Sequence, residues 1–215
     1  MSEDDEWKRV IPVIKKLKAE HPYCTVSIDT RKVAIARGAL EAGADIINDE
    51  SGENNSCGSM AAVAGEFGVP IILMHSRGDP KTMTTMKLKD DVDIVEYIKE
   101  WLNVKTKDAI CNHGVSRWNV IGDPGIGFAK TEFQNLNLIA RIDSLTKCFP
   151  LLVGASRKGF VKKLHRHDID VASSAITSKC ALSGVSIIRV HDVRMAVDTV
   201  QMIRAILESD PILKT

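Results

Sequence analysis

The chain has 215 residues, of which 44% are hydrophobic and 27% are charged, and its formal net charge at pH 7 is +1. This composition is typical of a soluble globular protein and argues against a disordered chain. A net charge close to zero provides no long-range field for a polyanion, so any anionic ligand must be bound by a few local Lys and Arg side chains. We therefore expect a single domain over residues 1–215 that binds no nucleic acid. No apolar run approaches the roughly eighteen residues that span a bilayer, so we expect no membrane partner either.

Strand-like and helix-like patterns alternate along the whole chain. The spacing of apolar residues predicts helices at 7–17, 33–42, 60–67, 92–109, 131–147, 172–182 and 195–207. Short apolar runs predict strands at 25–28, 46–47, 70–74, 118–121, 151–153 and 187–188. Alternation of this kind predicts an α/β fold with a parallel sheet whose strands are buried on both faces.

The chemically distinctive residues follow the expected strands, at their C-terminal ends. These residues are Asp29, Asn48, His75, Asp123, Ser156, Lys158, Arg189 and His191. A (β/α)8 barrel gathers its active site from many strand ends, whereas an open doubly wound sheet uses one topological switch point. We therefore predict a TIM-type barrel with about six of the eight βα units, and we place the missing units before the N-terminus because the chain opens on a helix.

The segment Gly122–Lys130, GDPGIGFAK, joins an acid to a sharp turn directly after an apolar run. Glycine permits backbone conformations closed to other residues, and proline removes an N–H donor, so the chain turns where Asp123 leaves the strand. A carboxylate held there can face a ligand above the sheet. The alternative is a carboxylate that caps a turn or a helix.

Six short motifs occur in the order and spacing of a known family. They are Ser27-Ile28-Asp29-Thr30, Gly43-Ala44-Asp45-Ile46-Ile47-Asn48-Asp49, Leu73-Met74-His75, Asp123-Pro124-Gly125-Ile126-Gly127-Phe128, Ser156-Arg157-Lys158 and Arg189-Val190-His191-Asp192. Together they resemble the signatures of dihydropteroate synthase. This resemblance implies a TIM-barrel transferase of folate biosynthesis that is a target of sulfonamides. Such an enzyme joins p-aminobenzoate to 6-hydroxymethyl-7,8-dihydropterin pyrophosphate and releases pyrophosphate.

The resemblance also implies roles for individual side chains. Asp29, Asn48 and Asp123 would bind the pterin, Lys158 would lie against it, and Asp29, Asp123 and Lys158 would be the catalytic groups. Ser156 and Phe128 would border the p-aminobenzoate site, and Arg189 and His191 would bind the pyrophosphate. The cofactor would be Mg²⁺, although we assign no metal ligand to this chain.

Residue chemistry supports two of these assignments. A pterin presents both an amide and an amino group along one edge, so carboxylates that accept and an Asn amide that also donates suit it well. Arg189 and His191 are two residues apart on the last expected strand, a spacing that turns both side chains to one side. The fork of an arginine donates paired hydrogen bonds to phosphate oxygens.

Two segments of the resembled family have no counterpart in this sequence. These are an Asn-x-Thr-Pro-Asp-Ser-Phe-like motif on the first strand and a Gly-Gly-Glu-Ser-Thr-Arg-Pro-like loop, which in the family help bind magnesium and pyrophosphate. We therefore expect a chain that is truncated at its N-terminus relative to the family. Two other functions stay open at this point: a catalytically inactive pterin-binding or assembly protein, and a corrinoid-linked pterin methyltransferase.

Partners and location follow from weaker signals. The resemblance favours a homodimer and allows fusion to other folate-pathway domains. The five cysteines include no C-x-x-C pair, which predicts free thiols rather than a zinc site. The acidic N-terminus is unlike a leader peptide, so we expect a cytoplasmic protein, or an organellar one if a leader precedes Met1.

We interpret residues 165–170 as a polar surface loop, and Met83 and Met86 as residues that fill a core or cover a groove.

Overall fold

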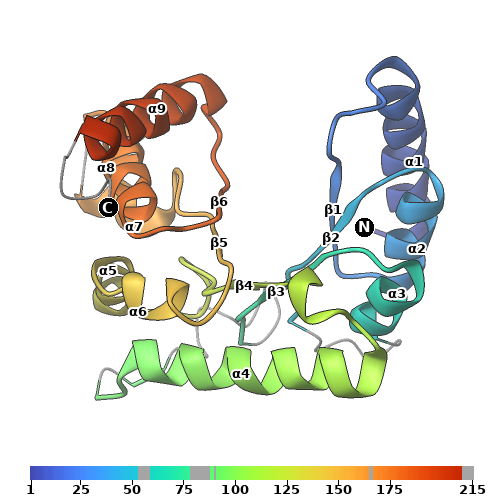
Figure 1. The fold of residues 1–215 in the computed structure, drawn as a ribbon, viewed down its shortest axis with the longest axis horizontal. Helices are drawn as coiled ribbons and strands as arrows, with labels where there is room; N and C mark the ends of the chain where they lie inside the picture. Colours follow the sequence, from blue (N-terminus) through green and yellow to red (C-terminus); the bar gives the residue numbers. More distant parts are fainter. Residues whose placement is uncertain (53–58, 78–87, 90, 165–166, 210–215) are drawn as a thin grey trace. The chain divides into compact units, whose positions relative to one another are not determined.

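The computed structural model describes residues 1–52, 59–77, 88–89, 91–164 and 167–209. Helices and strands alternate along these residues, as expected (Figure 1). The helices are α1 (Glu3–Glu20), α2 (Val33–Glu41), α3 (Met60–Phe67), α4 (Ile94–His113), α5 (Glu132–Ala140), α6 (Asp143–Thr146), α7 (Gly159–Leu164), α8 (Ile169–Leu182) and α9 (Val193–Ser209). The strands are β1 (Ser27–Thr30), β2 (Ile46–Asp49), β3 (Ile71–Met74), β4 (Val120–Asp123), β5 (Leu152–Val153) and β6 (Ile187–Ile188).

The chain divides into two compact units. The first contains Met1–Ser76 and Glu100–Asp123, and the second contains Arg77–Lys99 and Pro124–Thr215. Each unit has its own parallel sheet, β1-β2-β3-β4 in the first and β5-β6 in the second. The expectation of one domain over the whole chain stays a prediction.

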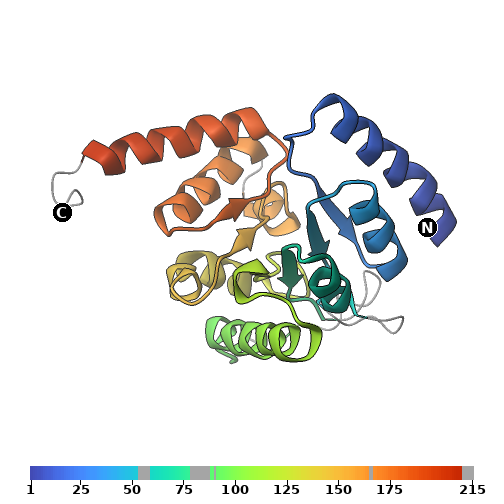
Figure 2. The ribbon, with the colours of Figure 1, turned by 45° about the vertical axis from the view of Figure 1, so that its right-hand side comes forward.

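The sheet of the first unit has one face that packs against helices. Ile28, Ile47, Ile71, Leu73 and Val120 belong to a buried cluster with apolar side chains of α1, α2 and α3. Figures 1 and 2 show these three helices along one side of the strands. Because successive side chains of a strand point to opposite faces, the alternate residues of these strands lie on the other face.

An ion pair connects α1 with the residues that directly precede β1 and β2. Lys18 Nζ donates to Asp45 Oδ2 over 2.6 Å and to the carbonyl of Cys24 over 2.7 Å. The same carboxylate accepts the backbone N–H of Val26 over 2.7 Å. The hydrogen bond from Lys18 lowers the pKa of Asp45 below its ordinary value. One carboxylate therefore connects the C-terminal half of α1 with the starts of two strands.

The helices of the second unit differ from the expectations in two places, since α7 was not predicted and the helix expected over 131–147 is divided. The capping box of α5 is confirmed, since Thr131 Oγ1 accepts the N–H of Gln134 and the Gln134 side chain accepts the N–H of Thr131. The single helix expected over 131–147 is wrong, because α5 ends at Ala140 and the short α6 follows. Arg141 leaves the helical conformation there, and the turn buries Ile142 completely.

The strand expected at 118–121 begins two residues later. Arg117–Asn119 form a 3-10 helix, and β4 runs from Val120 to Asp123. Trp118 is 86% exposed, so its apolar character does not mark a buried strand. Asn119 instead donates through Nδ2 to the carbonyl of Gly68 over 2.9 Å.

None of the helices among the described residues is long and apolar enough to cross a bilayer.

The contact between α3 and the end of α4 depends on Gly65. A Cβ at this position would overlap the carbonyl oxygen of His113, which is a backbone atom and cannot rotate away. We expect Gly65→Ala to lower the free energy of unfolding by about 1–2 kcal/mol, because overpacking outweighs the better helix propensity of alanine. Urea unfolding followed by circular dichroism measures this change.

Gly159→Ala is the matched control. Gly159 begins α7, and a Cβ there would meet no atom within 4 Å. This variant should be as stable as the parent protein or slightly more so. Equal stability of Gly65→Ala and the parent would show that α3 and α4 do not pack as described.

Candidate functional site

Asp29, Asn48 and Asp123 lie on the same face of the first sheet. Asp29 and Asn48 are register partners in β1 and β2. Asn48 is paired with Ile72 of β3, and Asp123, which ends β4, is paired with Met74, two residues further along β3. Since residues two apart in a strand point to the same side, all three polar side chains belong to the face opposite the helical core. The expected placement of these residues at the C-terminal ends of strands is confirmed, although all three lie within the strands and not after them.

Asn48 carries the clearest sign of a ligand. Its side chain is 6% exposed, and its Oδ1 atom is buried and accepts no hydrogen bond from the described residues. Leaving a buried polar atom without a partner costs about 1–3 kcal/mol. A native protein retains such a cost where the atom meets a bound molecule or an ordered water.

Asp123 and Asp29 differ in their exposure. Asp123 is 6% exposed, and its backbone carbonyl accepts the N–H of His75 over 2.9 Å. Asp29 lies on the edge strand and is exposed. His75 itself is fully buried, and its ring meets the edge of Trp101 with the centroids 5.2 Å apart. This contact makes His75 a packed residue next to the backbone of Asp123.

A buried lysine shapes the loop that follows Asp123. Lys130 Nζ donates to the carbonyls of Gly125 and Phe128, over 2.8 and 3.0 Å. From α5, Asn135 accepts the N–H of Gly127 over 2.7 Å through Oδ1 and donates to the carbonyl of Thr131 over 2.8 Å. Neither Lys130 nor Asn135 was identified from the sequence, although a lysine that ends a Gly-rich turn is a signal for such a role.

The loop brings Phe128 against Lys158. Lys158 Nζ lies 4.0 Å from the centroid of the Phe128 ring, a favourable cation–π distance. Gly127 has a φ of +85°, and a Cβ there would lie 3.0 Å from Lys158 Cδ. Glycine is therefore needed both for the backbone conformation and for the passage of the lysine stem.

Ser156 and His191 contact each other at the end of the second sheet. Ser156 is 8% exposed, and its Oγ lies 3.0 Å from His191 Nδ1 and 3.4 Å from the backbone N of His191. The sequence interpretation placed Arg189 and His191 on the last strand, which is wrong because β6 ends at Ile188. The strand period therefore does not set their directions, and both side chains are exposed.

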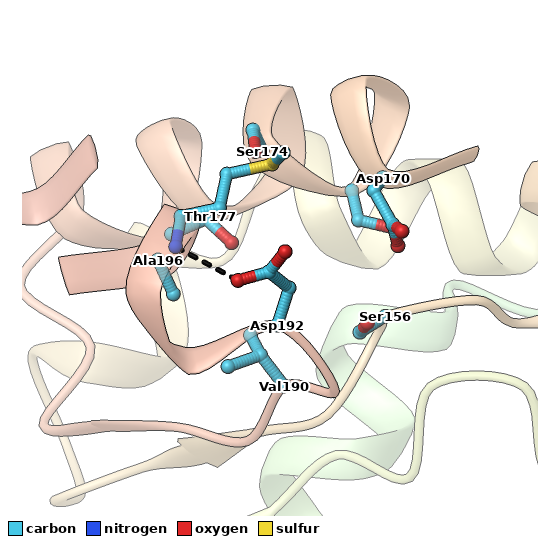
Figure 3. Close-up of a pocket in the computed structure, with 9 residues that line it drawn as sticks. Ser156, Asp170, Ser174, Thr177, Val190, Asp192 and Ala196 are labelled. Carbon is cyan, nitrogen blue, oxygen red and sulfur yellow. Dashed lines mark hydrogen bonds between the residues drawn. The ribbon is translucent and has the colours of Figure 1, made fainter. Parts of the chain in front are cut away.

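A small pocket lies next to Ser156. Figure 3 shows Ser156, Asp170 of α8 and Asp192 around it, and Asp192 Oδ1 accepts the N–H of Met195 over 2.9 Å. The pocket volume is about 10 Å³, close to the minimum that one water molecule needs. Asp192 thus acts as a cap for α9 and borders a space too small for a substrate.

Arg157 forms an ion pair that was not foreseen from the sequence. Its Nε and Nη2 atoms donate to the two carboxylate oxygens of Asp170, each over 2.8 Å. These hydrogen bonds raise the pKa of Arg157 and lower the pKa of Asp170. The neighbouring Asp168 accepts the N–H groups of Asp170 and Val171 and caps α8.

The described residues offer no ready site for magnesium. No group of three or more His, Cys, Asp or Glu side chains among them is arranged to hold a metal ion. Asp168 and Asp170 are engaged with α8 and Arg157, which leaves the polar stretch at 165–170 without a ligand set among its described members. His165, Met83, Met86 and Cys57 lie outside the described residues.

The fold is a parallel α/β arrangement whose C-terminal strand ends carry polar side chains, and comparisons identify the family. The model of the pterin binding enzyme family matches residues 1–191. Dihydropteroate synthase of Synechocystis is 40% identical over 194 residues, which are 88% of this chain and 65% of that protein. The folic acid synthesis protein fol1 of Schizosaccharomyces pombe is 38% identical over 96% of this chain and 29% of that protein.

Solved structures agree with this match. Dihydropteroate synthase of Yersinia pestis, in a sulfonamide drug complex, superposes with a TM-score of 0.89 at 31% identity, over 98% of this chain and 76% of that one. The Xanthomonas albilineans enzyme with 4-aminobenzoic acid gives 0.87 at 30% identity, over 98% of this chain and 74% of that one. The chain belongs to the pterin-binding enzyme family, and its fold is a partial (β/α)8 barrel. It spans 65% and 29% of the lengths of the two curated relatives named above.

A side chain kept for binding should not be needed for folding. We expect Asn48→Leu to leave the free energy of unfolding unchanged or to raise it, because the apolar side chain removes a buried oxygen that has no protein donor among the described residues. Asn135→Leu should instead lower it by about 1–3 kcal/mol, because the hydrogen-bond partners of Asn135 in the loop are lost.

Chemical unfolding of the two variants beside the parent protein measures this contrast. Both asparagines are nearly buried, so the comparison isolates the difference in hydrogen bonding. An equally large loss of stability in Asn48→Leu would show that Asn48 supports the fold and would remove the main sign of a ligand.

Proposed function

We propose that this protein takes part in the dihydropteroate synthase reaction, in which p-aminobenzoate displaces pyrophosphate from 6-hydroxymethyl-7,8-dihydropterin pyrophosphate. The family membership supports this proposal, and so do relatives that are named dihydropteroate synthase. The observation that carries it is the buried Oδ1 of Asn48, which has no donor among the described residues and lies on the same sheet face as Asp29 and Asp123.

The pterin is the ligand that we assign to this face. Its edge carries N–H donors beside acceptor atoms, which matches two carboxylates and one amide. Asn48 Oδ1 and the carboxylates of Asp29 and Asp123 would accept from the pterin amino and amide groups. Because Asn48 and Asp123 are nearly buried, their hydrogen bonds to the pterin would form away from bulk water, where they are stronger.

The second unit supplies the other groups that we assign to the substrates. Lys158 would contact the pterin, and Phe128 would border p-aminobenzoate. The two side chains are neighbours, since Lys158 Nζ lies 4.0 Å from the centroid of the Phe128 ring. Ser156 would bind p-aminobenzoate, and the exposed Arg189 and His191 would bind the pyrophosphate. Arginine suits this ligand because its planar fork donates two parallel hydrogen bonds to phosphate oxygens.

The reaction needs no protein nucleophile. The amine nitrogen of p-aminobenzoate forms a bond to the exocyclic methylene of the pterin as the bond to the pyrophosphate oxygen breaks, and the amine then loses a proton. Orientation of the two reactants supplies much of the rate, and the carboxylates of Asp29 and Asp123 would stabilise positive charge that develops on the pterin. We derive no step from magnesium, because the described residues offer no ligand set for it.

Three further assignments belong to the same proposal. The protein would act in the cytoplasm, would form a homodimer and would bind sulfonamides in the place of p-aminobenzoate. The solved Yersinia pestis relative in a sulfonamide drug complex supports the last of these. Fusion to other folate enzymes is suggested by the fol1 relative, of which this chain matches 29%.

Pterin binding is the most direct test. We expect the 215-residue protein to bind 6-hydroxymethyl-7,8-dihydropterin pyrophosphate in isothermal titration calorimetry. Asp123→Ala should weaken binding at least tenfold, since a lost hydrogen bond to a charged group is worth about 1.5–3 kcal/mol. Asn48→Ala removes a neutral acceptor, worth about 0.5–1.5 kcal/mol, and should weaken binding about two- to tenfold. Dihydropteroate formation, assayed with Mg²⁺ present, follows as a second measurement.

Asn119→Ala is the control, because Asn119 precedes β4 at the opposite end from Asp123. It should bind the pterin as tightly as the parent protein. If Asn48→Ala and Asp123→Ala also keep the parent affinity, the pterin does not bind to this face. A requirement for cobalamin together with a methylated folate would instead identify a corrinoid-linked methyltransferase.

A further inference from the structure

Arg157 adopts a backbone conformation that is rare for its residue type. Its φ is +56°, and among the described residues only Ala129 shares a positive φ without being glycine. The Cβ atom of an L-residue is crowded in this left-handed region, so the surrounding contacts must hold the residue there. Arg157 stands directly between Ser156 and Lys158, to which the proposed function assigns substrate contacts.

The first turns of α8 hold Arg157 at three points. Two are the parallel hydrogen bonds from its guanidinium to Asp170, and the third is the hydrogen bond from its backbone N–H to Ser173 Oγ over 3.3 Å. Ser173 Oγ donates in turn to the carbonyl of Ile169 over 2.7 Å. Figure 3 shows Asp170 on α8 and Ser156 at the same pocket. Both the side chain and the backbone of Arg157 are thus fixed by one helix.

The residues on either side of Arg157 have contacts that depend on its conformation. Ser156 contacts His191, and Lys158 contacts Phe128. Because peptide groups are planar, the φ and ψ angles of Arg157 set the direction of Lys158 relative to Ser156. A change of Arg157 to a right-handed or extended conformation would separate these two side chains from their present partners.

We propose that Arg157 and Asp170 are positioning residues: their ion pair keeps Arg157 left-handed and so directs Ser156 and Lys158 to the substrates without touching them. This inference rests on the proposed function of Ser156 and Lys158. The inference gives Arg157 a different role from Ser156 and Lys158, its neighbours in the Ser-Arg-Lys motif. The guanidinium of Arg157 is bound by both carboxylate oxygens of Asp170. The requirement at position 157 is therefore a conformation that the ion pair supplies.

Three variants test this inference. Glycine adopts a positive φ without crowding, whereas alanine does not. Arg157→Gly should therefore keep the affinity for p-aminobenzoate within about threefold of that of the parent protein. Calorimetry measures this affinity with pyrophosphate and 6-hydroxymethyl-7,8-dihydropterin already bound to the protein. Arg157→Ala and Asp170→Asn should weaken it by about tenfold, the change that the loss of one hydrogen bond from Ser156 to the carboxylate of p-aminobenzoate causes.

Two other ion pairs provide matched controls. Asp93 pairs with Arg141 in the second unit, and Glu66 pairs with Arg37 in the first, both through paired hydrogen bonds. Asp93→Asn and Glu66→Gln should leave the affinity unchanged. Equal losses in Arg157→Gly and Arg157→Ala would show that the guanidinium itself contacts a ligand, and parent affinity in Asp170→Asn would show that the pair has no role in positioning. Either result overturns the inference.

A measurement without ligand separates this inference from the proposed function. In two-dimensional NMR spectra, Asp170→Asn should shift the backbone amide signals of Ser156 and Lys158, and Asp93→Asn should not. If these shifts occur while the parent protein binds no substrate, the ion pair holds the segment and the proposed function is wrong. If the parent binds substrate and Asp170→Asn changes neither the shifts nor the affinity, the positioning role is wrong.

Discussion

Parallel pairing of β1, β2, β3 and β4 determines where the polar side chains of the first unit can act. The register places Asp29 level with Asn48, and the two-residue period then places Asp123 on the same face. A shift of one residue in any strand would turn its polar side chain into the helical core and its apolar neighbour out of it. The apolar cluster that packs Ile28, Ile47 and Val120 against the helices therefore also fixes the face to which we assign the pterin.

In the second unit, specific polar contacts and not a long sheet position the residues that we assign to the substrates. Its two strands contribute only two residues each, and the groups of interest lie beyond them. Lys130 and Asn135 hold the loop that carries Phe128, and Asp170 holds the segment that carries Lys158. Such contacts are individually modest in energy but strict in geometry, which suits side chains that must meet a small ligand.

The sequence allows the order of the six strands and the polar face of the first sheet to be predicted, because both follow from short-range patterns. The apolar runs reveal six strands, and the polar residues Asp29, Asn48 and Asp123 near the C-terminal ends of β1, β2 and β4 mark one face of the sheet. The exact ends of a strand cannot be predicted where an apolar side chain is exposed to solvent. Trp118 is such a residue, because it lies in an exposed 3-10 helix. The directions of Arg189 and His191 could not be predicted, because β6 ends before them and tertiary contacts replace the strand period.

The contacts of Arg157 show a further limit of pattern analysis. Asp170 lies 13 residues away in the sequence, on a different helix, so no local spacing connects the two side chains. The positive φ of Arg157 is equally invisible in the sequence, because arginine rarely adopts it and no glycine marks the position. A motif such as Ser-Arg-Lys therefore records which side chains are present, whereas the direction in which each one points depends on a partner elsewhere in the fold. The proposed binding of the substrates therefore depends on residues that hold the backbone in place as well as on residues that face the ligand.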